Sequence, residues 1–368
     1  MLSKFGKLFR RNPRKPYRLL QVEVSLACNL RCVMCPWVAL RENDELMARE
    51  TFSRIAENFH QAEWVDLSGG GEPLLHPRLP EMVRIAREAG CEVGFSTNGV
   101  LLGPSLAEEF VATRLDWIAF SVDGAIAETY ERIRQGARFD QVMANVAALR
   151  DIKSAHGSKT PKLMMVYVMM RENYAELPAF IDLAHELGVE QVVAKNLDVI
   201  VKEGDNDRRL FSHTDAESGR VDARDVAAAI AAAIAEAERR ARGHGIALRV
   251  YALRPQEQPI CEHNPLRNLF FNWEGYVSPC ITLSYADSRV FNGERHFVPC
   301  QRFGNINQAS LAEIWDGVAY REFRAPYVER VRLARQATVD LLLGAAEAEL
   351  PIPPAPEGCR TCYYLYGV

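Results

Sequence analysis

Short apolar runs alternate with amphipathic stretches over the first half of the chain. Six runs of strand length occur between Tyr17 and Leu197, and stretches of helical periodicity separate them. Strands that alternate with helices indicate parallel βαβ units. Six units are too few for a closed eight-unit barrel, so we predict an α/β fold with an open, partial (β/α)6 TIM-like barrel. The expected strands begin near residues 19, 64, 91, 117, 163 and 191.

The second half of the chain follows a different pattern. Residues 201–225 are charged and lack apolar periodicity, whereas Val226–Arg242 is alanine-rich and predicts a bridging helix. After Arg254, loops, aromatic residues and cysteines dominate, with helices expected at Leu311–Trp315 and Val328–Glu347. The pattern predicts a basic N-terminal arm (1–16), the barrel (17–200), a linker loop with the bridging helix (201–254) and a small C-terminal α+β domain (255–368).

Composition and charge restrict the environment of the protein. The chain is 48% hydrophobic with a net charge of −4, and no apolar run approaches the length of a membrane span. Its start lacks the apolar core of a signal peptide, so we expect a cytoplasmic protein without a membrane partner. The first eighteen residues carry seven basic and no acidic residues. They indicate a solvated arm or a docking segment for an acidic partner. The remaining charge distribution favours no nucleic-acid partner.

Nine cysteines are unevenly distributed along the chain. Eight fall within residues 28–35 and 261–362, and Cys91 alone lies between these regions. In a reducing compartment, such clusters indicate metal or iron–sulfur ligation rather than disulfides. Cys91, on a predicted strand, is interpreted as a core residue.

Cys28, Cys32 and Cys35 form a C-x3-C-x2-C motif directly after the first predicted strand. Three thiolates can hold three irons of a cubane and leave the fourth iron without a protein ligand. A structural zinc ion is an alternative, although it normally takes four protein ligands. A redox dithiol, which needs only two cysteines, is another.

The motif and its position resemble the hallmark of the radical S-adenosylmethionine (SAM) superfamily, whose cysteines follow the first strand of a partial barrel. The segment Gly70-Gly71-Glu72-Pro73 is similar to the GGEP segment that contacts the SAM amino group in that family. Glycines allow close backbone approach, and a carboxylate suits an ammonium group. Polar positions after later strands resemble the family's SAM contacts; they are Ser96, Asn98, Ser121, Asp123 and Arg134.

Arg134 has a second interpretation, and Met34 departs from the usual pattern of the family. Arg134 aligns with an arginine that reaches the SAM carboxylate in related enzymes, but a surface helix arginine is an alternative. Met34 stands where the family usually has an aromatic residue beside the adenine, and methionine fills the same apolar role. The resemblance implies a SAM-binding [4Fe–4S] cluster, reductive cleavage of SAM to a 5′-deoxyadenosyl radical, and hydrogen abstraction from a substrate carbon. It also implies a flavodoxin- or ferredoxin-type electron donor.

The later cysteines resemble the SPASM/twitch extension of many radical SAM enzymes. Asn272–Cys280 predicts a hairpin that turns at Gly275 and places Cys280 on the return strand. The complete SPASM pattern has seven cysteines and two auxiliary clusters, whereas five cysteines follow Arg254 here. The resemblance therefore implies one auxiliary [4Fe–4S] cluster, with a structural zinc ion as the alternative. Its expected ligands are Cys261, Cys280, Cys359 and Cys362.

Cys300 is then left over, with three interpretations. It is a core thiol, a replacement for one of the four expected ligands, or a hydrogen-atom donor such as the spare cysteine of radical SAM epimerases.

The substrate is the least determined feature of the sequence. The resemblance favours oxidation (dehydrogenation) or epimerisation of a small molecule such as a sugar or natural-product intermediate, and we expect no peptide-binding domain before the barrel. The alternative is a maturase that crosslinks or otherwise modifies a peptide or protein, or matures a cofactor. A non-catalytic iron–sulfur redox or sensor protein is an alternative of another class. Gly70-Gly71-Glu72 argues against it, because an electron carrier needs no SAM pocket.

Overall fold

The computed structural model describes residues 15–41, 45–211, 221–342 and 352–368. Most of the predicted basic arm, with its proposed acidic partner, lies outside the described residues. So do residues 212–220 of the predicted linker and residues 343–347 of the last predicted helix.

A curved ten-stranded sheet organises the part of the chain that the structure describes. Its strands run in the order β12-β9-β8-β1-β2-β3-β4-β5-β6-β7, and β1 to β7 are parallel neighbours. The six predicted strands are confirmed as β1 (Tyr17–Val22), β2 (Ala62–Asp66), β3 (Glu92–Thr97), β4 (Trp117–Ser121), β5 (Lys162–Met169) and β6 (Gln191–Asn196).

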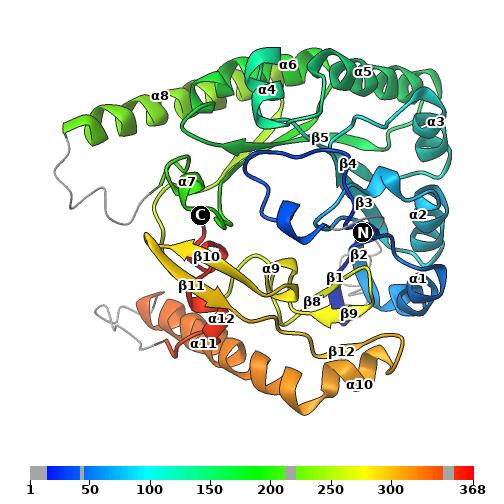
Figure 1. Cartoon of the computed structure of the whole chain (residues 1–368), viewed down its shortest axis with the longest axis vertical. Coiled ribbons are helices and arrows are strands. Elements are labelled where there is room, and N and C mark those ends of the chain that lie inside the picture. Colours follow the sequence, from blue (N-terminus) through cyan, green and yellow to red (C-terminus); the bar gives the residue numbers. More distant parts are fainter. Residues whose placement is uncertain (1–14, 42–44, 212–220, 343–351) are drawn as a thin grey trace, which may run out of the picture.

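Helices cover the convex face of this sheet, whereas the loop after β1 lies inside its curve (Figure 1). This arrangement is that of a partial TIM-like barrel, as predicted. Apolar side chains of the strands and helices form one continuous buried core between them. The helices are α1 (Arg49–Ala56), α2 (Leu79–Glu88), α3 (Pro104–Ala112), α4 (Ala127–Ile133), α5 (Phe139–Ala155) and α6 (Leu177–Glu186).

The predicted bridging helix has a different role in the structure. It is α8 (Val221–His244), and the chain continues from it into β7 (Ala247–Val250), which pairs parallel with β6. Asp182 of α6 accepts from His244 at 2.8 Å and pairs with Arg240, so α8 packs beside α6. The helix therefore belongs to a further βα unit of the barrel. Because β7 has only four residues and is partly exposed, its apolar pattern is weak.

The C-terminal part of the chain continues the same sheet at its other edge. β8 (Asn268–Phe271) pairs parallel with β1, and β9 (Tyr276–Ser278) and β12 (Gly304–Asn305) add antiparallel strands. The predicted hairpin is confirmed, with Gly275 at φ +90° in its turn. Cys280, however, is not on the return strand. Pro279 has no N–H to continue the ladder, and Cys280 caps the short helix α9 (Ile281–Ser284).

The remaining elements pack around this sheet edge. The predicted helix Val328–Glu347 is part of α11, which begins ten residues earlier and tolerates Pro326 in its interior. These elements are α7 (Glu203–Asn206), the antiparallel pair β10 (Asp287–Phe291) and β11 (Glu294–Val298), α10 (Leu311–Asp316), α11 (Val318–Leu342) and α12 (Glu357–Arg360).

Candidate active site

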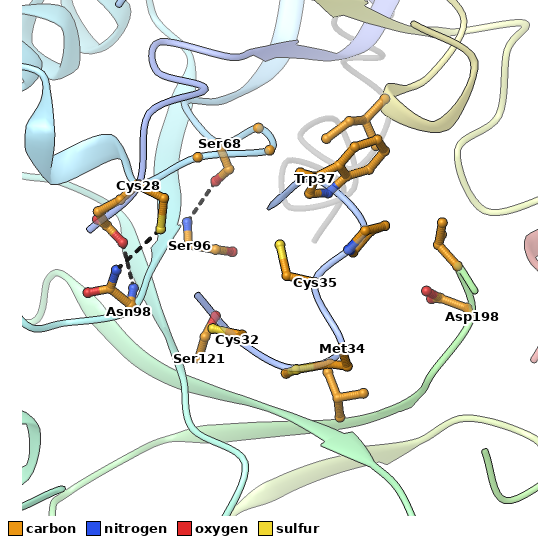
Figure 2. Close-up of a pocket in the computed structure, with 18 of the residues that line it drawn as sticks. Cys28, Cys32, Met34, Cys35, Trp37, Ser68, Ser96, Asn98, Ser121 and Asp198 are labelled. Atoms are coloured by element: carbon orange, nitrogen blue, oxygen red, sulfur yellow. Dashed lines mark hydrogen bonds between the residues drawn. The ribbon is translucent and has the colours of Figure 1, made fainter. Parts of the chain in front are cut away.

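A cavity of about 360 Å³ opens at the carboxyl ends of the parallel strands. Loops that follow β1, β2, β3, β4 and β6 reach it, because the carboxyl ends of parallel strands meet at one edge of a sheet. Figure 2 shows the three cysteines of the first motif around this space. The predicted site residues that line it are Cys28, Cys32, Met34, Cys35, Gly70, Gly71, Glu72, Ser96, Asn98, Ser121 and Arg134.

Backbone hydrogen bonds fix the cysteine loop in place. The N–H groups of Arg31 and Val33 donate to the carbonyls of Gln135 and Ile133, each at 3.0 Å. The Cys35 N–H donates to the Cys32 carbonyl at 3.2 Å, which closes the turn between the two thiols. Burial raises the pKa of the Cys32 thiol to about 11. Iron binding would overcome this cost, because metal ligation deprotonates thiols.

Two guanidinium groups contact sulfurs of this loop. Arg134 Nη1 lies 3.8 Å from Cys32 Sγ, and Arg41 Nη2 lies 3.3 Å from Cys35 Sγ. Arg134 is buried, so the interpretation as a surface arginine is wrong. The positive charges of these two guanidinium groups would offset the negative charge that accumulates when the neighbouring thiols ionise to bind iron. Three cysteines that share two cations and one cavity suit a cubane with an open iron.

Asp123 positions Arg134 rather than lining the cavity. Its Oδ2 accepts from Arg134 Nε at 2.7 Å, and its Oδ1 accepts from the Val168 N–H at 2.7 Å. The Asp123 carboxyl group is fully buried. The observed role of the Asp123 carboxylate is to hold the Arg134 guanidinium, and a contact of Asp123 with SAM stays a prediction.

The glycine segment approaches the cysteine loop too closely for side chains. A Cβ on Gly71 would lie 2.3 Å from the Ala27 carbonyl oxygen, and one on Gly70 would lie 2.8 Å from Leu26 Cδ1. Arg41 joins the two loops, because its Nη2 also donates to the Gly70 carbonyl at 2.5 Å. The glycines therefore bring the backbone to the edge of the cavity.

Glu72 uses its carboxylate mainly to organise these loops. It accepts from Thr97 Oγ1 at 2.6 Å, from the Asn98 N–H at 2.8 Å and from the Leu74 N–H at 3.0 Å. Burial raises the pKa of Glu72, and these hydrogen bonds oppose that rise. Pro73 lies behind Glu72, buried at the start of a 3-10 turn, and does not line the cavity. The side-chain contact of Glu72 with SAM stays a prediction.

Two further carboxyl groups lie near the ends of β1 and β2, the buried Glu23 and the half-buried Asp66. Burial raises the pKa of both Glu23 and Asp66 to about 7. Glu23 accepts from the Gly70 N–H at 2.7 Å and from Tyr285 Oη, and so joins the glycine segment to the C-terminal part of the chain. In the sequence, Glu23 and Asp66 could have been noticed because each is an acidic residue within the apolar pattern of a predicted strand.

The four expected auxiliary ligands gather at one place. Burial raises the pKa of the Cys261 thiol, and negative charge on Cys280 and Cys362 raises it further. Burial likewise raises the pKa of Cys359, together with charge on the same two neighbours and on Cys261. Backbone contacts join three of these cysteines: the Cys362 N–H donates to the Cys359 carbonyl at 3.2 Å, and the Leu283 N–H donates to the Cys280 carbonyl at 3.3 Å. A Cβ on Gly358, next to Cys359, would lie 3.0 Å from Leu283 Cδ2. The gathering of the four cysteines fits the donor set of a four-thiolate cluster.

Within the described residues, no three histidine, cysteine or acidic side chains are placed to hold one metal ion.

Cys300 is the remaining cysteine of the C-terminal part, and the next residue, Gln301, donates its N–H to the Leu283 carbonyl at 2.7 Å. Cys300 is exposed, so the interpretation as a core thiol is wrong, and it does not line the cavity. Cys91 is buried and donates to the carbonyls of Phe59 and Ala62, as a core residue does.

Several cavity residues were missed by sequence reasoning. Lys195 is the second-last residue of β6 and Asp198 follows that strand, and Tyr364 and His263 lie two residues after the last and first C-terminal cysteines. Figure 2 shows Asp198 across the cavity from the cysteine loop. Polar residues at the end of a predicted parallel strand were the available signal for Lys195 and Asp198. Trp37 and Arg41 also line the cavity.

Two family models match the chain. The model described as the radical SAM superfamily matches residues 22–208. The SPASM model, described as an iron–sulfur cluster-binding domain, matches residues 261–341.

Relatives of known function extend this comparison. The tungsten-containing aldehyde ferredoxin oxidoreductase cofactor-modifying protein of Pyrococcus furiosus is 26% identical over 315 residues, which cover 83% of each chain. Mycofactocin maturase MftC of Mycobacterium tuberculosis is 35% identical over 45% of this chain and 41% of its own. The GTP 3′,8-cyclase of Chlorobaculum tepidum is 37% identical over 45% of this chain and 50% of its own.

Solved structures share the fold. Streptococcus suis SuiB bound to precursor peptide SuiA has a TM-score of 0.61 at 14% identity and covers 96% of this chain and 71% of its own. The enzyme anSMEcpe with bound AdoMet and the Cp18Cys peptide has a TM-score of 0.62 at 14% identity. The match covers 94% of this chain and 93% of the anSMEcpe chain. In the described part of the chain, no helix is both long and apolar enough to cross a membrane.

Proposed function

Since the chain belongs to the radical SAM superfamily, we propose that it is a maturase that modifies a peptide or a peptide-derived cofactor. The observation that carries this proposal is the similarity to a cofactor-modifying protein over 83% of both chains. The partial similarity to a mycofactocin maturase supports it. These relatives favour the maturase alternative over the small-molecule oxidation that the sequence pattern first suggested.

The cofactors of the family fit the residues of this chain. The SAM-binding [4Fe–4S] cluster supplies, when bound, the electron that divides SAM into methionine and a 5′-deoxyadenosyl radical. Cys28, Cys32 and Cys35 would hold that cluster. Cys261, Cys280, Cys359 and Cys362 would hold one auxiliary cluster in the iron–sulfur cluster-binding domain.

The remaining residues of the cavity position these groups and exclude water. Arg41 and Arg134 donate to sulfurs of the cysteine loop, and Ser96, Asn98 and Ser121 offer polar groups along the strand ends. Trp37 and Met34 add apolar surface to the same wall. An enclosed wall of this kind would protect a carbon radical until it meets the substrate.

The auxiliary cysteines adjoin the cavity. Thr282 lines it, and its hydroxyl lies 3.0 Å from Cys280 Sγ. Tyr364 also lines it, and its backbone N–H hydrogen-bonds to the Cys362 thiol. A cluster beside the substrate would be placed to accept the electron that a substrate radical loses on oxidation, and we therefore favour an oxidative modification.

Formation of 5′-deoxyadenosine tests the proposal. Anaerobically reconstituted protein receives SAM, dithionite and a peptide fraction from the cells of origin, with half of that fraction treated beforehand with protease. We expect the untreated fraction to accelerate 5′-deoxyadenosine formation and the treated fraction to lose this effect. Cys28→Ala is expected to abolish formation, because it removes one ligand of the SAM cluster.

Other outcomes would overturn the proposal in distinct ways. Stimulation that survives protease treatment would identify a small-molecule substrate. Absence of 5′-deoxyadenosine with both clusters present would support an electron carrier or sensor.

A further inference from the structure

The wall of the cavity opposite the cysteine loop holds a half-buried ion pair. Lys195 Nζ lies 2.8 Å from Asp198 Oδ2, and the two side chains are 24% and 9% exposed. Both residues lie at the end of β6 and line the cavity. Figure 2 shows the Asp198 carboxylate pointing across the cavity toward Met34 and Cys35.

The C-terminal part of the chain completes this pair. Lys195 Nζ donates to Tyr364 Oη at 2.9 Å, and the ammonium also lies 5.2 Å from the centre of the Tyr364 ring. The His263 ring packs edge-on against Tyr364 at 4.5 Å, and its buried Nε2 has no hydrogen-bond partner among the residues that the structure describes. We call Lys195, Asp198 and Tyr364 the polar wall.

The charges of the polar wall restrict what it can bind. A carboxylate or phosphate offers only acceptors and is repelled by Asp198. An ammonium group offers only donors and is repelled by Lys195. A secondary amide is neutral and carries a C=O acceptor beside an N–H donor. The lysine ammonium has three N–H groups, and two of them face Asp198 and Tyr364, so one remains for a ligand.

We propose that the polar wall recognises a backbone amide of the substrate, with Lys195 donating to its carbonyl and Asp198 accepting from its N–H. This inference rests on the proposed function and specifies its substrate as a peptide with an unsubstituted amide near the reacting carbon. Asp198 of the polar wall faces the cysteine loop, and Tyr364 of the polar wall donates its backbone N–H to the Cys362 thiol. The amide would therefore be held between the two clusters.

The competing explanation is that the polar wall only stabilises the fold, because the Lys195–Tyr364 hydrogen bond joins residues that are 169 positions apart in the sequence. Peptide binding separates the two roles. The probe is a mixture of random pentapeptides with acetylated and amidated ends, equilibrated anaerobically with SAM-loaded holoenzyme. Retained peptides are quantified by mass spectrometry. A second mixture carries N-methylated backbone amides, which lack the N–H group.

The variant Lys195→Met/Asp198→Leu removes both charges together, so neither is left unpaired. Lys153→Met/Glu190→Leu is the matched control, because this pair is 2.6 Å apart but lies outside the cavity. We expect the cavity variant to lower peptide retention at least about tenfold, equivalent to one or two hydrogen bonds. N-methylation should lower retention by the wild type similarly, and the control variant should retain peptides as the wild type does. Iron content and melting temperature of each variant report whether it folds.

Equal retention by the wild type and a folded cavity variant would overturn the assignment of the polar wall and leave the proposed function intact. If the wild type retained the N-methylated peptides as well as the unmethylated ones, the assignment of the polar wall would likewise be overturned. A wild-type enzyme that cleaves SAM but retains neither mixture would contradict the proposed function itself.

Discussion

Arg41 joins the cysteine loop to the glycine segment at the sulfur of Cys35. Its guanidinium donates to Cys35 Sγ, to the Gly70 carbonyl and to the Leu30 carbonyl, the last at 3.2 Å. Hydrogen bonds to cluster sulfurs favour the reduced state, because reduction adds negative charge. We expect Arg41 to raise the reduction potential of the SAM cluster.

Arg41→Met tests this expectation. Loss of one such hydrogen bond, about 1 kcal/mol, corresponds to roughly 40 mV for a one-electron couple. The midpoint potential of the SAM cluster, measured by electron paramagnetic resonance during redox titration, should fall by this order. In the Arg41→Lys variant, the midpoint potential of the SAM cluster should fall less, because lysine keeps the positive charge. The potential of the auxiliary cluster provides an internal control, and an unchanged SAM-cluster potential would contradict the role of Arg41.

Glu23 should make stability depend on pH. Its pKa is about 7 in the folded chain and 4.5 when exposed, so the folded state binds the proton more tightly. Stability therefore falls as pH rises from about 4.5 to 7, by about 3 kcal/mol from this group. Glu23→Gln removes this contribution. The free energy of unfolding of wild type minus variant, measured with urea at several pH values, should decrease across that range. A constant difference would show that Glu23 titrates normally.

Cys300 should be dispensable. Its thiol is exposed and is not among the residues that line the cavity, so we expect it not to contact a substrate radical formed there. Cys300→Ala should keep the iron content, the product yield and the 5′-deoxyadenosine yield of the wild type. Loss of product with intact iron would restore the hydrogen-donor interpretation, whereas loss of about four irons would make Cys300 a cluster ligand.

At the scale of elements, α11 holds the segments that carry the auxiliary cysteines. Its buried Arg330 donates to the carbonyls of Pro259 and Gln258, just before Cys261, and to that of Pro353, before Cys359. It also pairs with Glu257 at 2.7 Å. The Arg330 side chain thus holds in place the segments that precede Cys261 and Cys359, two cysteines that are far apart in the sequence.

Arg330→Met should selectively weaken the auxiliary site. It leaves buried carbonyls unpaired, which costs on the order of 3 kcal/mol. We expect a chelator to remove iron from the auxiliary cluster faster than in the wild type, while the SAM cluster is unaffected. Arg332→Met is the matched control, because Arg332 lies on the same helix with an exposed side chain. Equal iron loss in both variants would contradict the role of Arg330.

Elements with strong local patterns were predictable from the sequence, and long-range pairings were not. The six strands from β1 to β6 follow from apolar runs separated by helical periodicity. β7 was missed because it is short and lies at an edge. The pairing of β8 with β1 joins residues about 250 positions apart, and no local pattern encodes it.

At the scale of the whole molecule, the first group of cysteines lines a cavity, and so do residues beside the second group, namely His263, Thr282 and Tyr364. The spacing of Cys28, Cys32 and Cys35 made the first group recognisable, and the loops at the strand ends followed from the barrel. The polar wall was not predictable, because folding brings Lys195 to Tyr364 from a distant part of the chain. Arg41 was missed because a single arginine after a cysteine motif carries no signal of its contacts.

The iron content of three proteins tests the central claim most directly. After anaerobic reconstitution, two [4Fe–4S] clusters predict about eight irons per wild-type chain. The variant Cys28→Ala/Cys32→Ala/Cys35→Ala and the variant with Cys261, Cys280, Cys359 and Cys362 changed to alanine should each keep about four. Addition of SAM should change the electron paramagnetic resonance spectrum of the second variant but not of the first, because only the second variant keeps the ligands of the SAM cluster. A wild type with about four irons, falling to none in the first variant, would contradict the account and remove the auxiliary cluster.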